Sequence, residues 1–180
     1  MEMTSTPQSP APEPLPSMSL LGRAVAVFAR PGEAWAGLER KGQWWFPLAL
    51  SILVSMVGTG LTYQRAIVPT QLQQYERQVE TGQMPPEAMS RIEEQAASPL
   101  AMVFALASVV VAVPLMTLVF ALMPWLAAGF MPGRRFRYRD AFVTTAWAGL
   151  VAIPAQVLTY TLAWLNESMT GVHTGFGVLL

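Results

Sequence analysis

Residues Gln95 to Gly133 read QAASPLAMVFALASVVVAVPLMTLVFALMPWLAAGFMPG, 39 residues without one charged side chain. Two shorter uncharged runs lie on either side, 23 residues from Gly42 to Gln64 and 26 residues from Ala141 to Asn166. About 20 apolar residues cross a hydrocarbon core as a helix, so each run is long enough to span a membrane. None of the runs shows the alternation of apolar and polar residues that is typical of barrel strands. Spans that are not barrel strands must be helical, because lipid offers no partner for free backbone N–H and C=O groups. The sequence therefore predicts an all-α, polytopic membrane helical bundle.

The middle run could hold one long helix or two short helices around a turn, because Pro114 lies near its centre. The charged residues that flank the runs distinguish the two arrangements. One helix places eight Lys and Arg residues on the N-terminal side and only Arg65, Arg77 and Arg91 on the other. This asymmetry follows the positive-inside rule, whereas two helices would place four arginines opposite the N-terminus. We expect the N-terminus inside, the C-terminus outside, and three spans at about 43–64, 99–127 and 141–165.

Composition excludes several classes of function. Eleven basic residues balance eleven acidic ones, so the chain lacks the basic excess that nucleic-acid binding requires. There is no cysteine, and His173 is the single histidine, so thiolate and multi-histidine metal sites are excluded. No Asp, Glu, Lys, Arg or His lies inside a predicted span, whereas proton relays and ion paths need such groups there. We expect no enzyme, no metal and no cofactor.

Two segments precede the membrane domain, which we assign to residues 42–180. Residues 1–18 are rich in proline and polar residues, which is typical of a disordered tail. Residues 19–41 predict two short amphipathic helices on the cytoplasmic side, the second beginning at Pro31. Such a segment can lie in the membrane interface or dock on the bundle. The first helix has one apolar face, and Arg23 and Arg30 lie off it; the face consists of Leu20, Leu21, Ala24, Val25 and Phe28.

The connection at 66–98 predicts an outer helical hairpin. Leu72, Tyr75 and Val79 share one face of a helix that Gly82 can end. A second helix follows Pro85 and Pro86, with these apolar residues on one face: Ala88, Met89, Ile92 and Ala96. Because no titratable cluster faces inward, we interpret the hairpin as a structural cap on the spans rather than as a binding site.

The spans carry candidate helix-packing residues and no catalytic ones. Ser51, Ser55 and Gly58 form a small-residue stripe that allows close approach of another helix. Gln156 is the most polar side chain in mid-membrane, and we expect it to bond to Thr117, to Ser108 or to a carbonyl freed by Pro154. A basic cluster is expected to lie on lipid headgroups and consists of Arg134, Arg135, Arg137 and Arg139.

The order of these parts resembles the Yip family, the Ypt/Rab-interacting multispan membrane proteins, and especially its bacterial members. The resemblance rests on the acidic outer hairpin and on short motifs: Phe28-Ala29-Arg30-Pro31 followed by Trp35, Pro47, Gly133 with Phe136, and Ala152-Ile153-Pro154. It implies a bundle of five helices without known catalysis, in a family whose eukaryotic members are implicated in vesicle traffic. Two further spans would then follow Leu180, and the apolar run Phe176–Leu180 reads as the opening of another element.

These observations predict a non-enzymatic scaffold with a membrane-organising or trafficking-like role in the bacterial cytoplasmic membrane. Its expected partners are the lipid bilayer and other membrane helices, from a second copy or from another protein. The alternative is a subunit of a transporter or channel. A transporter should show polar residues or broken helices facing each other at the midplane, and Pro114, Pro154 and Gln156 are a faint version of that pattern.

Overall fold

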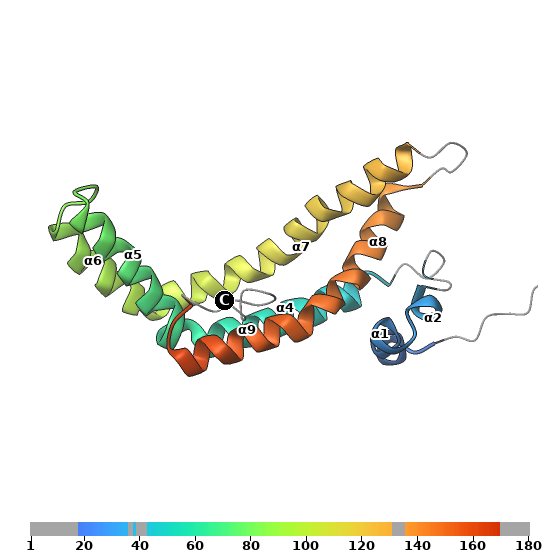
Figure 1. Cartoon of the computed structure of the whole chain (residues 1–180), viewed down its shortest axis with the longest axis horizontal. Coiled ribbons are helices and arrows are strands. Elements are labelled where there is room, and N and C mark those ends of the chain that lie inside the picture. Colours follow the sequence, from blue (N-terminus) through green and yellow to red (C-terminus); the bar gives the residue numbers. More distant parts are fainter. Residues whose placement is uncertain (1–17, 36–37, 39–42, 131–135, 170–180) are drawn as a thin grey trace, which may run out of the picture.

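Three long helices dominate the molecule. The computed structural model describes the following residues, whose regular elements are all helices: 18–35, 38, 43–130 and 136–169. A helical hairpin lies at one end of the long helices and two short helices lie at the other (Figure 1). The stretches that are long and apolar enough to cross a membrane are Trp45–Glu80, Pro99–Gly129 and Tyr138–Asn166. The predicted all-α polytopic bundle with three transmembrane helices is confirmed.

The first long helix continues past the predicted span into the outer hairpin. α4 (Trp45–Thr62) leads through a π turn, η1 (Tyr63–Ile67), into α5 (Val68–Glu80). The π turn ends two residues before Pro69, whose ring would clash with the carbonyl of Arg65 in a regular α-helix. The extra residue in the wider turn relieves this clash. The predicted boundary between span and hairpin near residue 65 lies inside this continuous helix, at the π turn.

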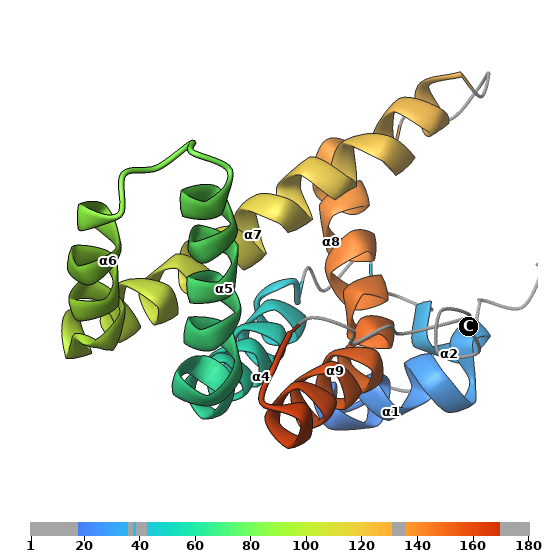
Figure 2. The ribbon, with the colours of Figure 1, turned by 60° about the vertical axis from the view of Figure 1, so that its left-hand side comes forward.

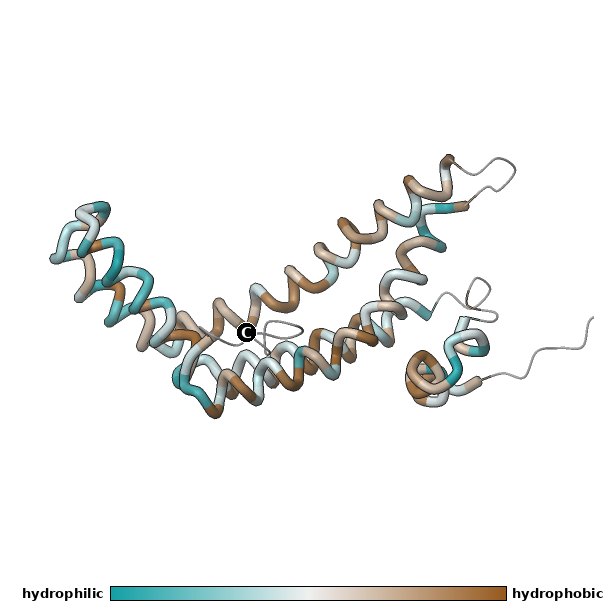
Figure 3. The backbone as a smooth tube through the Cα atoms, viewed as in Figure 1, coloured by the Kyte–Doolittle hydropathy of each residue, from teal (hydrophilic) through white to brown (hydrophobic). Residues whose placement is uncertain are grey.

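The hairpin packs through the faces that its apolar residues define. α6 (Glu87–Ala97) returns alongside α5, after a turn in which Gly82 has a φ of 70°. This left-handed conformation is one that glycine adopts without steric cost. Hydrophilic residues concentrate on this part of the chain (Figure 3). The apolar residues predicted to define these faces are all half-buried: Leu72, Tyr75, Val79, Ala88, Met89, Ile92 and Ala96.

The middle run forms one helix, α7 (Pro99–Gly129), although Pro114 and Pro124 lie inside it. Its start is fixed by Ser98, whose hydroxyl accepts a hydrogen bond of 3.2 Å from the Ala101 amide. Almost every α7 side chain stays exposed or half-buried. In a bilayer this helix therefore presents apolar side chains to lipid or to further helices.

The third long helix bends where it meets the first. α8 (Tyr138–Gly149) leads through a 3₁₀ turn, η2 (Leu150–Ala152), into α9 (Ile153–Asn166). The bend lies just before Pro154, whose ring cannot pack against the carbonyl of Leu150 in a regular α-helix. Beyond it α9 runs beside α4 in both ribbon views (Figures 1 and 2).

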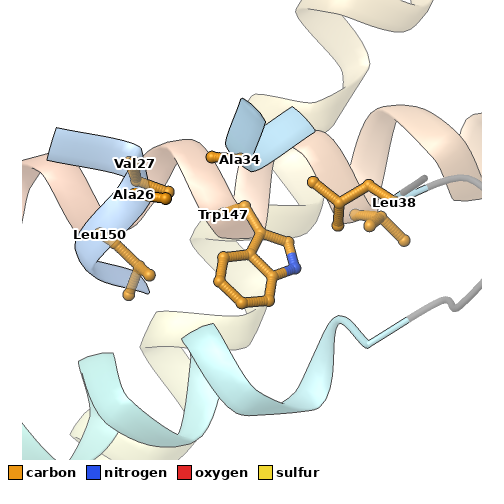
Figure 4. Close-up of a cluster of buried hydrophobic side chains, with 7 residues drawn as sticks. Ala26, Val27, Ala34, Leu38, Trp147 and Leu150 are labelled. Carbon is orange, nitrogen blue, oxygen red and sulfur yellow. The ribbon is translucent and has the colours of Figure 1, made fainter. Parts of the chain in front are cut away.

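The two short helices dock beside this bend. α1 (Leu20–Ala29) begins with a cap in which the Ser19 hydroxyl accepts from the Gly22 amide at 3.1 Å, and α2 (Pro31–Trp35) follows at once. Together with α8 and η2 they enclose a buried group around Trp147 that we call the inner cluster (Figure 4). Its members are Ala26, Val27, Ala34, Leu38, Val143, Trp147 and Leu150.

The predicted apolar face of α1 is divided, since Leu20 and Ala24 pack against the inner cluster while its other three residues are exposed. Arg23 is only 4% exposed, whereas Leu21, Val25 and Phe28 are 72%, 66% and 53% exposed. These three residues form what we call the outward face of α1. The sequence left interfacial insertion and docking open as alternatives. The structure shows α1 docked on the bundle, and its outward face remains exposed and available for insertion into the membrane interface.

Several sequence-based expectations fall outside the described residues. They concern the tail at 1–17, Arg134 and Arg135 of the basic cluster, His173 and the apolar run Phe176–Leu180.

Candidate functional site

A buried arginine holds the inner cluster together. The Arg23 guanidinium donates a hydrogen bond of 2.9 Å to the carbonyl of Ala34, which fixes α2 against α1. Its Cζ atom lies 5.8 Å from the centroid of the Trp147 ring, within cation–π range. Phe46 stacks on the same indole with a centroid distance of 5.9 Å. The start of α4, the two short helices and α8 thus converge on one tryptophan.

The predicted small-residue stripe lies where α4 meets α9. Ser55 and Gly58 are buried and Ser51 is half-buried. A Cβ atom at Gly58 would collide with the aromatic ring of Tyr160 on α9. Gly58 therefore lets the ring lie directly against the backbone of α4, which is the kind of close approach that small residues permit in membranes.

Gln156 lies on α9 one turn before Tyr160. Its Oε1 atom is buried without a hydrogen-bond partner. The two hydroxyls expected to bond with it are engaged in their own helix, since Thr117 donates to the Val113 carbonyl and Ser108 to the Ala105 carbonyl. Neither hydroxyl therefore donates to Gln156 Oε1, because Ser and Thr in helices bond readily to the preceding turn.

The described part of the basic cluster lies at the entrance to α8. Arg137 is the N-cap residue, and its side chain and that of Arg139 are exposed. Between them, Tyr138 donates a hydrogen bond of 2.7 Å to the Leu118 carbonyl and meets Trp125 edge-on at 6.0 Å. Tyr138 thus ties α8 to α7 and leaves the neighbouring guanidinium groups directed away from the protein.

The outer ends of α4 and α9 are joined by an ion pair. Arg65 in the π turn lies 3.1 Å from Glu167, the residue that ends α9 with a φ of 51°. The Arg65 Cζ atom also lies 4.6 Å from the centroid of the Trp164 ring. One turn further out, the Thr70 hydroxyl accepts from the Met169 amide at 2.9 Å. We call this set of contacts the outer clasp.

An open apolar groove runs between α4 and α9 below the outer clasp. It has a volume of about 570 Å³, and Trp164 lies at its outer end. The α4 wall contains Leu53, Val57 and Leu61, and the α9 wall contains Val157, Tyr160 and Trp164. In the chain as described, three surfaces can thus engage other molecules: this groove, the outward face of α1, and α7.

A comparison with protein families finds the Yip1 domain over residues 25–180, which includes the three candidate transmembrane helices and the second half of α1. The chain belongs to the Yip family. The resemblance drawn from its short motifs is therefore confirmed. Searches of curated proteins and of solved structures found no match.

The described residues of this Yip-family chain do not assemble a group of three or more His, Asp or Glu side chains that could hold a metal ion. The contacts found in its helices are instead packing contacts, caps and ion pairs near the helix ends. The apolar helices of this multi-pass membrane protein imply contact with the lipid bilayer.

Sequence reasoning missed the contacts that organise both ends of this Yip-family bundle. Trp147 lay unremarked inside an apolar run, and Arg23 was placed off the apolar face of its helix without a buried partner. Arg65 and Glu167 are 102 residues apart, so no local pattern connects them. The one available signal was the arginine itself, because a basic residue at the first turn after a span needs either solvent or a partner.

Proposed function

We propose that this Yip-family protein is a non-enzymatic membrane scaffold that organises the lipid surface on its N-terminal side. The observation that carries the proposal is the outward face of α1, three large apolar side chains exposed on a helix that is itself fixed to the bundle. Phe46, at the start of the first span, packs against the same inner cluster. The outward face is therefore held at membrane level, where an amphipathic helix inserts among headgroups.

The second part of the proposal concerns orientation and location. Eight basic residues flank the N-terminal side of the spans and three flank the other side. We infer a bacterial cytoplasmic membrane with the N-terminus in the cytoplasm, since basic loops are retained on that side. Arg137 and Arg139 then face the anionic inner leaflet together with α1, and each contributes about 1 kcal/mol of attraction.

The third part concerns protein partners. α7 exposes large apolar side chains along its length, and they include Phe104, Val111, Phe120 and Met123. A scaffold of this kind works by association with other membrane helices, from a second copy or from a partner protein.

The experiment compares membrane remodelling by two matched variants. Purified protein is reconstituted at increasing density into vesicles of anionic and zwitterionic lipid, and vesicle diameter is measured by electron cryomicroscopy. The triple variant Leu21→Ser, Val25→Ser and Phe28→Ser removes the outward face, whereas Leu21→Met, Val25→Ile and Phe28→Leu preserves it. We expect the wild type and the preserving variant to reduce vesicle diameter and the serine variant to lose this effect. Equal diameters for all three proteins would contradict the proposal.

A transporter or channel subunit is the second candidate. The buried and unpartnered Oε1 atom of Gln156 favours it, because transport sites place polar groups near the midplane. A flux assay on the same vesicles separates the candidates. Ion or solute flux that Gln156→Leu abolishes, without any change in vesicle diameter, would favour transport over scaffolding.

A further inference from the structure

The groove between α4 and α9 has the size and lining of a ligand site. Its volume of about 570 Å³ lies within the range of small-molecule pockets, about 300–1,000 Å³. The walls are formed almost wholly by aliphatic and aromatic side chains. A hydrocarbon chain lying along the two helices matches this lining without leaving a polar group unpaired.

The outer end of the groove carries both signs of charge. Trp164 lines the groove, and the Arg65 guanidinium lies over its ring at 4.6 Å. Glu167 lies 3.1 Å from Arg65, and the two side chains are 49% and 65% exposed. An arginine has five N–H donors, and the bond to Glu167 uses one of them. The ion pair is therefore open to a further molecule on both its positive and its negative side.

The position of the ion pair along the helix corresponds to the lipid headgroups. From Trp45, at the start of α4, to Arg65 the chain advances about 30 Å at 1.5 Å per residue. This length equals the thickness of the hydrocarbon core, about 30 Å. With Trp45 at one interface, Arg65 and Glu167 lie at the other, and the groove extends from them toward the midplane.

We propose that the groove binds one acyl chain of a phospholipid whose headgroup is phosphoethanolamine. The phosphate contacts Arg65 and the primary ammonium contacts Glu167. Each charge of the zwitterionic headgroup is thus paired with the opposite charge of the ion pair. A quaternary ammonium has no N–H to donate to the Glu167 carboxylate, which disfavours phosphocholine. An anionic headgroup without an amine would add a second negative charge beside Glu167 and is disfavoured for that reason. This site is separate from the α1 surface of the proposed function.

The test measures the lipid retained by full-length protein. Delipidated protein in mild detergent is titrated with phosphatidylethanolamine, phosphatidylcholine or phosphatidylglycerol of identical acyl chains, and bound lipid is counted by native mass spectrometry. We expect one phosphatidylethanolamine per chain, retained in preference to the other two lipids. Arg65→Gln should reduce that retention about tenfold, the loss typical of one charge-assisted hydrogen bond. Arg91→Gln, on the exposed surface of α6, is the matched control and should change nothing.

A second pair of variants tests the groove itself. Leu61→Trp fills the groove from the α4 wall, and Leu126→Trp adds the same bulk on the exposed surface of α7, outside the groove. Only the first should reduce lipid retention. Brominated acyl chains should quench the fluorescence of Trp164. That fluorescence is measured as the difference between wild type and Trp164→Phe. Equal retention of the three lipids, unchanged retention in Leu61→Trp, or a dimer that Leu61→Trp dissociates would each overturn the proposal.

Discussion

Gly58 and Gly60 lie in the same turn of α4 and should respond differently to the same substitution. In a helix interior, replacing glycine by alanine stabilises by about 1 kcal/mol because it restricts the unfolded chain. At Gly60 an added Cβ would meet the Met102 Cε atom at 3.9 Å, an ordinary van der Waals contact. At Gly58 it would collide with the ring of Tyr160 and force α9 away. Overpacking of this kind costs about 1–3 kcal/mol.

We therefore expect Gly58→Ala to be less stable than Gly60→Ala by about 1–3 kcal/mol. The measurement is equilibrium unfolding in mixed micelles of increasing dodecyl sulfate content, followed by the helical circular dichroism signal. Gly60→Ala controls for the intrinsic effect of alanine in this helix.

A double-mutant cycle with Tyr160→Ala identifies the cause. Without the ring, Gly58→Ala should become neutral or stabilising, which gives a coupling energy of about 0.5–3 kcal/mol between the two positions. The reasoning is refuted if Gly58→Ala and Gly60→Ala have equal stability, or if the cost at Gly58 persists when Tyr160 is removed.

Three further predictions test the inner cluster and the topology. Trp147→Ala should destabilise the protein by about 3–5 kcal/mol and make α1 susceptible to protease. Trp147→Phe keeps an aromatic ring and should retain most of the protection of α1 from protease. Full protection of α1 in the alanine variant would contradict the packing role of Trp147. A cysteine at Gln83 should react with an impermeant thiol reagent from outside and one at Gly133 should not, and the reverse pattern would overturn the assigned orientation. Replacing the four basic-cluster arginines by Gln should yield mixed orientations in the same labelling assay, and an unchanged pattern would mean that the other basic residues suffice.

The sequence predicted the helices better than their contacts. Uncharged runs identified the spans because lipid imposes a length and excludes charge, and both constraints are local in sequence. The hairpin faces were correct for a related reason, since residues such as Tyr75 and Ile92 obey the helical period. Pro154 indicated irregularity, but the 3₁₀ turn before it depends on how neighbouring helices pack, and the π turn before Pro69 was not predicted.

The packing side of α1 could not be predicted from its periodicity. A membrane protein can direct its most apolar face outward, because the surrounding medium is as apolar as its interior. A buried residue such as Arg23 then finds its partner on another helix, and the charge no longer identifies the exposed side. Local patterns likewise did not show that Thr117 and Ser108, two of the partners expected for Gln156, donate within their own helix.

The unbroken helix from Trp45 to Glu80 makes the outer hairpin a lever on the first span. About 22 Å of helix extends beyond Arg65, so a tilt of about 10° displaces its tip by about 4 Å. The opposite arm of the hairpin ends at Ser98, where an extended backbone with ψ of 142° separates α6 from α7. Rotation between the first and second spans should therefore concentrate at Ser98. Spin labels placed on either side of Ser98 would report the motion of the membrane-embedded helices from outside the membrane.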